Sequence, residues 1–244
     1  RPAVFIGVNL NAEERRMYNA IKPDKMPEAS ADDPAGVHGD GYQALVARWI
    51  DTALNKHGEL RAILSGKRAT RLMASKDAAL LELLPDWWAE SGKVIVYSPY
   101  RVTIERVERM LRGKFPDLGV ATITGSKSSQ ERLNAFHAFR DDSSVWTMLI
   151  TDAAAESLNL QACASRIHFY DRVYVPARES QIVGRLYRRG QANPVVSSFF
   201  VMRDTIDEDI QRVHRKRLRM MEIVEELAAP VLSDRGREIL EGAG

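Results

Sequence analysis

Short apolar segments alternate with helical ones over residues 92–204, and this alternation constrains the fold more than any other feature of the sequence. The apolar runs are KVIVYS (93–98), GVATIT (119–124), VWTMLIT (145–151), SRIHFYD (165–171) and VVSSFFVM (195–202). Most of them are apolar at consecutive positions, which is typical of strands buried on both faces of a sheet. The helical segments between them are predicted at 101–113, 128–140, roughly 153–160 and 177–189. This repetition predicts βαβ units around a parallel sheet, and therefore an α/β fold.

Ligands of such sheets gather at the carboxyl ends of the strands. In this sequence, those ends are Ser98, Gly125, Thr151 with Asp152, and Asp171. We therefore expect functional side chains near these positions.

The first part of the chain has a different character. Asn11 is followed by Glu14, which predicts a helix that begins with a reciprocal capping arrangement. Residues 22–41 are rich in Gly and Pro and nearly free of large apolar side chains, so we expect a mobile loop. Residues 42–58 have apolar positions at helical spacing and predict an amphipathic helix.

A second helix is predicted over 75–92, with Ser75 as its cap and Pro85 as a residue that bends or ends it. Residues 205–227 predict a long helix with a basic patch. We therefore divide the chain into a linker and helical segment over 1–91, an α/β domain over 92–204 and a helical extension over 205–244.

Charge and cysteine content exclude several classes of protein. The net charge is only +2, so any nucleic-acid surface must be local. Cys163 is the only cysteine, which excludes an internal disulfide and fits a reducing compartment. No run of 18 apolar residues and no signal-peptide pattern occurs, so no membrane partner is expected. The chain opens without Met, and we expect it to be part of a longer protein.

The string QIVGRLYRRGQ (181–191) carries the strongest functional signal. Read as a helix, it places Gln181, Gly184, Arg185 and Arg188 on one face. A pair of arginines one turn apart can bind phosphate oxygens through planar, bidentate hydrogen bonds and stabilise charge on a transferring phosphoryl group. The alternative is a solvated helix face that carries salt bridges.

The same string resembles the last signature motif of superfamily 2 helicases and translocases, and its Arg-x-Gly-Gln ending resembles the SWI/SNF branch. Other segments resemble that family in the same order: LNAEERRMYNAI, SKDAALLELLPDWW, KVIVYSPYRVTIERVERML, ITGSKSSQERLNAFHAFR, LITDAAAESLNLQACASRIHFYD and DEDIQRVHRKR. Glu156, the Leu-Asn-Leu-Gln pattern and Pro176 lean toward the bacterial branch that includes the RNA-polymerase-recycling ATPase.

The resemblance implies the second, C-terminal RecA-like lobe, with a helical insertion before it and a long C-terminal helix after it. It implies that Arg185 and Arg188 are catalytic arginine fingers. Four further residues are expected to bind the nucleotide: Gln181, Gly184, Asn159 and Glu156. The residues expected to contact nucleic acid are Ser98, Arg101, Gly125, Ser126, Thr151 and Asp152. For Asn159, Glu156 and the strand-end residues, turn or cap formation is an alternative of similar weight.

The resemblance also implies cofactors and partners. ATP and Mg²⁺ are expected to be bound mainly by a first RecA-like lobe, because this chain has no G-x-x-x-x-G-K-[S/T] loop and no Asp-Glu-x-His string. The expected partners are that lobe of the same protein and double-stranded DNA or a nucleoprotein complex. The full-length protein is expected to hydrolyse ATP, and this chain alone is not. The expected location is the cytoplasm or nucleoid in a bacterium and the nucleus in a eukaryote.

Some positions depart from the family pattern. Ala154, Ala155 and Ser157 stand where family members usually have glycine, and Val175 stands where they have Asn. These departures keep two alternatives open. One is a degenerate lobe that binds nucleic acid or protein without turnover, and the other is a lobe of an RNA helicase.

Overall fold

A computed structural model describes residues 3–21, 62–63, 73–152, 158–173, 176–208, 210–212, 214–215 and 219. The predicted loop at 22–41 and the predicted helix at 42–58 lie outside these residues. So do the departures from the family pattern at 154, 155, 157 and 175, and most of the predicted C-terminal helix.

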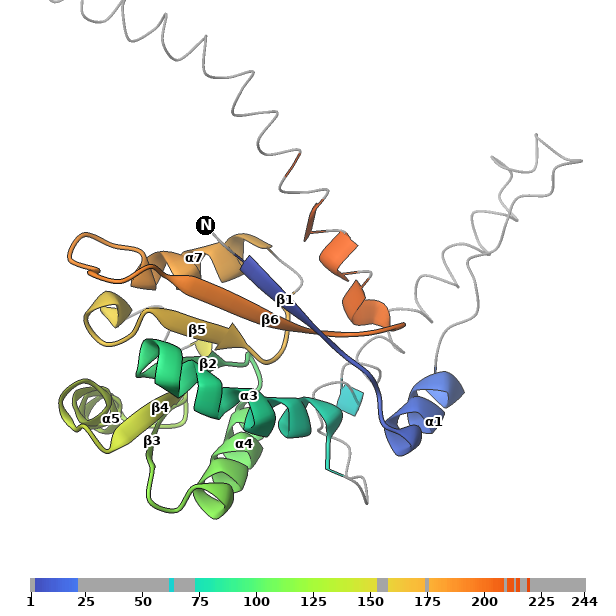
Figure 1. The fold of residues 1–244 in the computed structure, drawn as a ribbon, viewed down its shortest axis with the longest axis horizontal. Coiled ribbons are helices and arrows are strands. Elements are labelled where there is room, and N and C mark those ends of the chain that lie inside the picture. Colours follow the sequence, from blue (N-terminus) through green and yellow to red (C-terminus); the bar gives the residue numbers. More distant parts are fainter. Residues whose placement is uncertain are drawn as a thin grey trace, which may run out of the picture.

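Six parallel strands form one sheet in the order β1-β6-β5-β2-β4-β3 (Figure 1). Five of them confirm the strands predicted from the apolar runs: β2 (Val94–Tyr97), β3 (Gly119–Ile123), β4 (Val145–Ile150), β5 (Arg166–Phe169) and β6 (Val196–Met202). The predicted α/β class with a parallel sheet is therefore confirmed.

The edge strand β1 (Ala3–Val8) was not predicted. It pairs with β6, so that Phe5 lies opposite Phe199 and stacks on it, with ring centroids 5.4 Å apart. Most of its side chains are exposed, so it lacks the continuous burial that identifies the inner strands. Its position depends on pairing with a strand nearly two hundred residues away in sequence, which no local pattern encodes.

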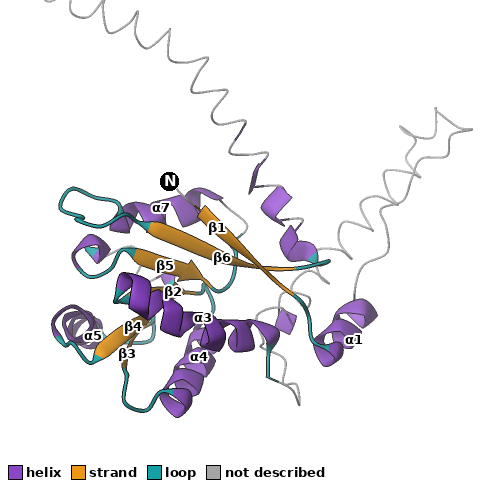
Figure 2. Cartoon of the chain, in the orientation of Figure 1, coloured by secondary structure: helices purple, strands orange, loops and turns teal. Residues whose placement is uncertain are grey.

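Helices cover both faces of the sheet (Figure 2). One face packs against α1 (Ala12–Ile21), α3 (Ser75–Ser91) and α4 (Arg101–Lys114), and the other against α5 (Ser129–Asp141), the short η2 (Leu160–Ala162) and α7 (Pro176–Leu186). The alternation of side chains along each strand creates two cores. On β2, Val94 and Val96 belong to the first core, whereas Ile95 and Tyr97 belong to the second.

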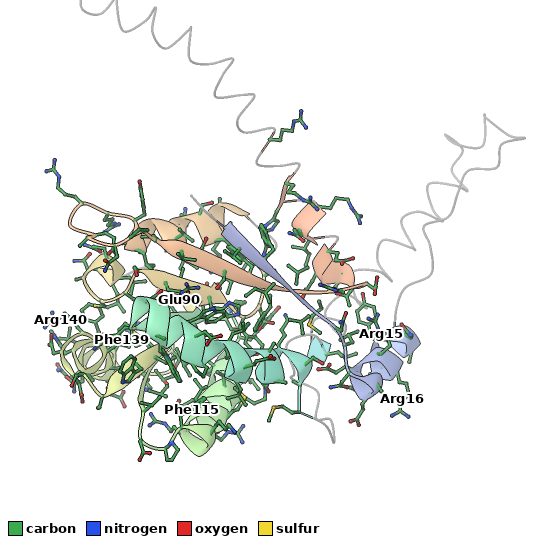
Figure 3. All side chains as sticks on the ribbon, viewed as in Figure 1. Arg15, Arg16, Glu90, Phe115, Phe139 and Arg140 are labelled. Atoms are coloured by element: carbon green, nitrogen blue, oxygen red, sulfur yellow. The ribbon has the colours of Figure 1, made fainter. Side chains whose placement is uncertain are left out.

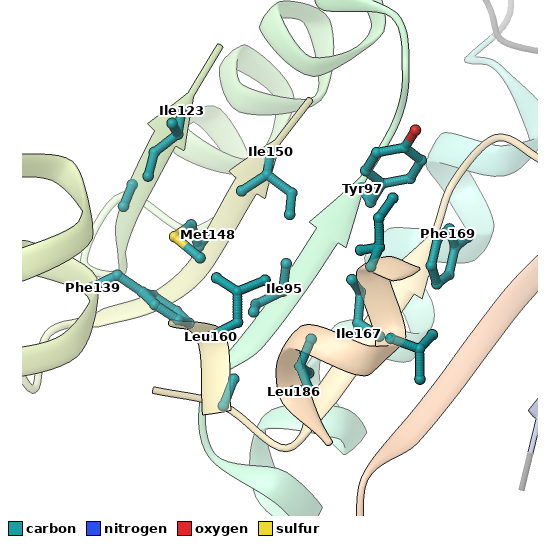
Figure 4. Packing of buried hydrophobic residues seen from close by; sticks show 14 of the residues in the cluster. Ile95, Tyr97, Ile123, Phe139, Met148, Ile150, Leu160, Ile167, Phe169 and Leu186 are labelled. Atoms are coloured by element: carbon teal, nitrogen blue, oxygen red, sulfur yellow. The ribbon is translucent and has the colours of Figure 1, made fainter. Parts of the chain in front are cut away.

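The second core fixes the helix that carries the arginine motif. Leu186 of α7 and Phe139 of α5 are completely buried against the strands, among Ile95, Met148 and Ile167 (Figure 4). Full burial of one such side chain stabilises the fold by about 1.5–3 kcal/mol. The apolar side of α7 is therefore committed to the sheet, and its polar side is left facing outward.

The capping predictions have mixed outcomes. Asn11 and Glu14 form the expected reciprocal pair: the Glu14 N–H donates to Asn11 Oδ1 at 2.9 Å and the Asn11 N–H to Glu14 Oε2 at 3.1 Å. The prediction that Ser75 caps α3 is wrong, since Ala74 holds the cap position and the Ser75 hydroxyl donates to Glu14 instead. Pro85 does not end α3, which continues to Ser91.

The arginine helix is shorter than predicted, because α7 ends at Leu186 and not at 189. The amide side chain of Gln191 donates to the Leu186 carbonyl at 3.4 Å, which provides a partner for a carbonyl at the helix end. Gly190 then takes a φ of +99°, a conformation that L side chains rarely adopt. The chain thus turns away from the helix axis just after Leu186.

Candidate functional site

A pocket of about 420 Å³ lies on the polar face of α7, and we call it the arginine pocket. Its lining residues are Asp152, Arg178, Gln181, Ile182, Gly184, Arg185 and Arg188. The two predicted fingers and two of the predicted nucleotide-binding residues therefore line one cavity. Their roles in binding and catalysis stay predictions.

Gly184 keeps the middle of this pocket open. A Cβ built on Gly184 would meet no atom of the described chain within 4 Å, so internal packing does not require glycine there. Ile182, Val183 and Leu186 on the neighbouring side of α7 are buried. The arrangement leaves room for a group from outside the chain between the arginines, and guanidinium groups suit an anionic group with several oxygens.

Arg188 reaches the pocket from the turn after α7 and not from the helix itself, which corrects the prediction of a continuous helical stripe. Its Nη1 donates to Asn159 Oδ1 at 3.5 Å, which links a predicted catalytic residue to a predicted nucleotide-binding one. Gln191 fixes the turn, because its Nε2 also donates to the carbonyls of Ala164 at 2.9 Å and Gln161 at 3.2 Å. Glu156 lies outside the described residues.

Asp152 also lines the arginine pocket, and its predicted role as a nucleic-acid contact stays a prediction. Its Oδ1 accepts a hydrogen bond from the Tyr97 hydroxyl at 2.6 Å, and its Oδ2 pairs with Arg178 Nη2 at 2.9 Å. Burial and this hydrogen bond raise the pKa of the Tyr97 phenol above its ordinary value, so the phenol stays a proton donor. A carboxylate repels phosphate groups, so it is unsuited to contact a nucleic-acid backbone directly.

Arg178 and Tyr97 are site residues that the sequence reading missed. Arg178 precedes Gln181 by three positions and Arg185 by seven, so extending the helical stripe by one turn would have found it. Tyr97 carries no such signal, since it occupies the last position of an apolar strand and its importance depends on the neighbouring β4.

The candidate nucleic-acid residues separate into exposed and buried ones. Gly125 and Ser126 are exposed, just before α5, and the Ser126 hydroxyl lies 2.9 Å from that of Thr124. Arg101 is exposed at the start of α4 and pairs with Glu105 at 3.0 Å. These three predicted residues therefore lie on accessible surface at the carboxyl ends of the strands or next to them.

Ser98 and Thr151 are buried, unlike these three residues, and their predicted contacts with nucleic acid stay predictions. Ser98 is completely buried; its hydroxyl donates to Asp171 Oδ2 at 2.8 Å and accepts the Tyr100 N–H at 3.1 Å. Thr151 is also buried, and its N–H donates to the Ile123 carbonyl at 3.1 Å. Each residue connects neighbouring segments of the fold through these hydrogen bonds.

Asp171, at the end of β5, is part of a buried ion cluster. Lys76 Nζ lies 3.2 Å from Asp171 Oδ1 and 3.3 Å from Asp207 Oδ2, and all three side chains are nearly inaccessible. Burial acts to lower the pKa of Lys76, but the carboxylates of Asp207 and Asp171 together raise it above its ordinary value. The cluster joins the start of α3 to the end of β5 and to the segment after β6.

The next residue, Arg172, forms a second buried network with α7. Its Nε and Nη2 donate to Glu179 Oε1 and Oε2, both at 2.9 Å, and Nη2 lies 2.7 Å from His214 Nδ1. The Val173 N–H donates to Glu179 Oε1 at 3.2 Å. These bonds fix the first turn of α7 to the end of β5, and so determine the direction from which the helix approaches the arginine pocket.

Two histidines, His137 and His168, lie outside the arginine pocket. His168 is completely buried between Trp87 and Phe200, and burial lowers its pKa well below the ordinary value. His137 lies 2.8 Å from Arg140 on α5.

Within the residues that the structure describes, no three His, Cys, Asp or Glu side chains are grouped so that they could hold a metal ion. No helix in that same part of the chain is long and apolar enough to cross a membrane.

The residues that line the arginine pocket lie in a segment that matches a known protein family. The model of the helicase conserved C-terminal domain matches residues 75–190. DNA repair protein rad8 of Schizosaccharomyces pombe is 28% identical over 130 residues, 53% of this chain and 11% of that protein. The helicase/translocase YwqA of Bacillus subtilis, whose assignment is itself provisional, is 27% identical over 206 residues, 83% of this chain and 22% of that protein. The chain therefore spans about a tenth to a fifth of the length of these relatives.

Solved structures share the fold. The C-terminal part of the Fun30 ATPase domain has a TM-score of 0.62 at 16% identity and covers 88% of this chain and 89% of its own. The SWI2/SNF2 ATPase core of Sulfolobus solfataricus in complex with double-stranded DNA has a TM-score of 0.62 at 19% identity, over 86% of this chain and 43% of its own. The helicase conserved C-terminal domain model thus matches just under half of this chain, and the parallel sheet with flanking helices has the RecA-like fold of the SWI2/SNF2 ATPase C-terminal domain of Sulfolobus solfataricus, to which it is similar.

Proposed function

We propose that this chain is the C-terminal motor lobe of an ATP-dependent translocase or remodeller that acts on double-stranded DNA. The observation that carries the proposal is the arginine pocket, in which three arginines face an open cavity on a rigidly fixed helix. Arg185 and Arg188 would contact the terminal phosphates of ATP bound on a partner lobe and stabilise the charge that develops during phosphoryl transfer. ATP with Mg²⁺ supplies the phosphoryl group, and the chain supplies cations in a fixed geometry.

The fixed geometry of α7 matters because the stabilisation of a developing phosphoryl charge depends on where the arginine side chains are placed. The buried pair of Arg172 and Glu179 sets the start of α7, and Leu186 sets its end against the sheet. Gln181 and Asn159 would add neutral hydrogen-bonding groups near the nucleotide. A misplacement of about 1 Å at such a site can reduce a rate by about a hundredfold.

The nucleic-acid track would use the exposed residues at the carboxyl end of the sheet. Gly125, Ser126 and Arg101 would contact phosphates and not base edges, so binding would depend little on sequence and strongly on salt. A homologous ATPase core has been solved with double-stranded DNA, which supports a duplex as the track. The lean toward the bacterial RNA-polymerase-recycling branch remains part of the proposal.

The direct test compares this chain alone with the same chain joined to an ATP-binding lobe. The chain alone is expected to show no ATP hydrolysis above background. The joined protein is expected to hydrolyse ATP faster when double-stranded DNA is added. Stimulation by single-stranded RNA but not by duplex DNA would favour an RNA helicase, and DNA binding without any turnover would favour a non-catalytic lobe.

A further inference from the structure

We propose that Arg178 is a third phosphate-binding arginine of the arginine pocket, and that Asp152 is an internal anion that occupies Arg178 until a triphosphate group displaces it. This inference rests on the proposed function, since it assumes that the pocket receives phosphates. It adds a binding residue and a competing group to the two arginines of the motif.

Arg178 shares the pocket with the motif arginines by virtue of helix geometry. It precedes Arg185 by seven residues, or two turns, so both side chains leave the same face of α7. Both line the pocket together with Arg188. The Arg178 side chain is 48% exposed, so its guanidinium is accessible to a ligand in the cavity.

Asp152 presents one oxygen to the pocket from a fixed position. Its Oδ1 accepts the Tyr97 hydroxyl at 2.6 Å, and Tyr97 is completely buried at the end of β2. Its Oδ2 is then directed at Arg178 Nη2, 2.9 Å away. This second oxygen occupies the position at which Arg178 would hold a phosphate oxygen.

The energetics of this pair suit a contact that can be exchanged. A partly exposed ion pair contributes about 0.2–1 kcal/mol. A triphosphate carries more negative charge than one carboxylate and can accept several charge-assisted hydrogen bonds from Arg178, Arg185 and Arg188 at once. The ligand therefore competes successfully for Arg178, whereas an isolated monovalent anion does not.

The Asp152–Arg178 pair is not needed to anchor the helix. Glu179, the residue after Arg178, already fixes the first turn of α7 through its buried bidentate pair with Arg172. That pair is inaccessible, with 3% and 7% of the two side chains exposed. The two neighbouring residues thus have different contacts: Glu179 anchors the helix to Arg172, and Arg178 lines the pocket.

The experiment measures binding of inorganic tripolyphosphate to the 244-residue chain at low salt, by NMR titration. Asp152→Asn removes the competing charge but keeps an oxygen that can accept the Tyr97 hydroxyl. Asp141→Asn is the matched control, because it makes the same change in net charge in an exposed ion pair on α5. The partner in that ion pair, Arg140, is labelled in Figure 3. Relative to that control, Asp152→Asn is expected to bind tripolyphosphate up to about fivefold more tightly, the factor that corresponds to about 1 kcal/mol. Adding Arg178→Ala to Asp152→Asn is expected to remove most of the gain.

A single Arg178→Ala variant keeps the test decisive if Asp152→Asn folds poorly. It leaves the Tyr97–Asp152 bond intact and is expected to weaken tripolyphosphate binding at least threefold. Equal affinities for Asp152→Asn and Asp141→Asn, or an unchanged affinity for Arg178→Ala, overturn the inference. Arg185→Ala separates this failure from a failure of the proposed function. If Arg185→Ala weakens binding while the other variants have no effect, only the inference fails; if Arg185→Ala has no effect, the phosphate pocket itself is refuted.

Discussion

The guanidinium of Arg172 forms a buried bidentate pair with the carboxylate of Glu179, with both N–O distances at 2.9 Å. Arg172 follows β5 in the sequence, and Glu179 lies in the first turn of α7. The pair therefore fixes α7, the helix that carries the arginine pocket, relative to the sheet. Removal of one partner leaves the other charge in the interior without its main counterion.

Glu179→Ala is expected to lower the free energy of unfolding by about 3–5 kcal/mol, because it leaves the buried Arg172 charge without its carboxylate partner. Denaturant unfolding of the chain measures the change. Glu105→Ala is the control, since Glu105 pairs with Arg101 on the exposed surface of α4 and its loss is expected to cost less than about 1 kcal/mol. Equal losses for the two variants would show that the buried pair has no special role.

Lys76→Met is expected to destabilise the chain at neutral pH by about 3–5 kcal/mol, since it leaves Asp171 and Asp207 buried without their cation. The pKa of Lys76 is raised in the folded chain, so its contribution to stability is complete below the unfolded value of 10.5 and is lost as the pH rises through the folded value. The difference between wild type and Lys76→Met should therefore be constant from about pH 7 to pH 10 and shrink at higher pH. A difference that instead grows above pH 10.5 would contradict the assignment.

Gly190→Ala is expected to cost about 1–2 kcal/mol, because the φ of +99° is unfavourable for a residue with a Cβ. In the protein joined to an ATP-binding lobe, it should also reduce ATP turnover, since Gly190 belongs to the turn that carries Arg188. The control is Gly113→Ala, within α4, where a Cβ would meet no atom of the described residues within 4 Å and alanine should stabilise the helix by about 0.5–1 kcal/mol. Gly190→Ala should therefore melt at a lower temperature and hydrolyse ATP more slowly than Gly113→Ala. Equal melting temperatures and equal turnover rates for the two variants would refute the role of this turn.

Duplex DNA is expected to bind this chain weakly and with little sequence preference. Arg101→Ala should weaken binding and reduce the slope of log affinity against log salt by about 0.9, as for one lost phosphate contact. Arg140→Ala, which removes an equally basic exposed residue at the far end of α5, should leave the slope nearly unchanged. An affinity that barely responds to salt, or a slope altered equally by both variants, would contradict the proposed track.

The sequence predicted the inner strands well because burial on both faces leaves a local mark, a run of consecutive apolar residues. It could not predict β1, whose exposed side chains carry no such mark and whose place depends on pairing with β6. The arginine face of α7 was predictable from helical spacing, whereas the exit of Arg188 from the helix depends on Gln191 bonds to distant carbonyls.

Site residues at strand ends were harder to assign. A hydroxyl or carboxylate after an apolar run marks the correct edge of the sheet, but the pattern does not show which way the side chain faces. Ser98 turns inward to Asp171, and Asp152 turns toward Arg178, while Ser126 stays exposed. These directions depend on partners that lie many residues away in the sequence.

The central claim is that Arg185 and Arg188 act on the transferring phosphoryl group. It is tested most directly by the DNA-stimulated ATPase rates of Arg185→Ala and Arg188→Ala in the protein joined to an ATP-binding lobe, measured beside thermal melting. Both side chains face the cavity, so each variant should lose no more than about 0.5 kcal/mol of stability. Turnover should fall by about 10³-fold or more, and lysine should restore little of it, because it lacks the planar fork. Variants that stay folded and hydrolyse ATP at the wild-type rate would contradict the claim.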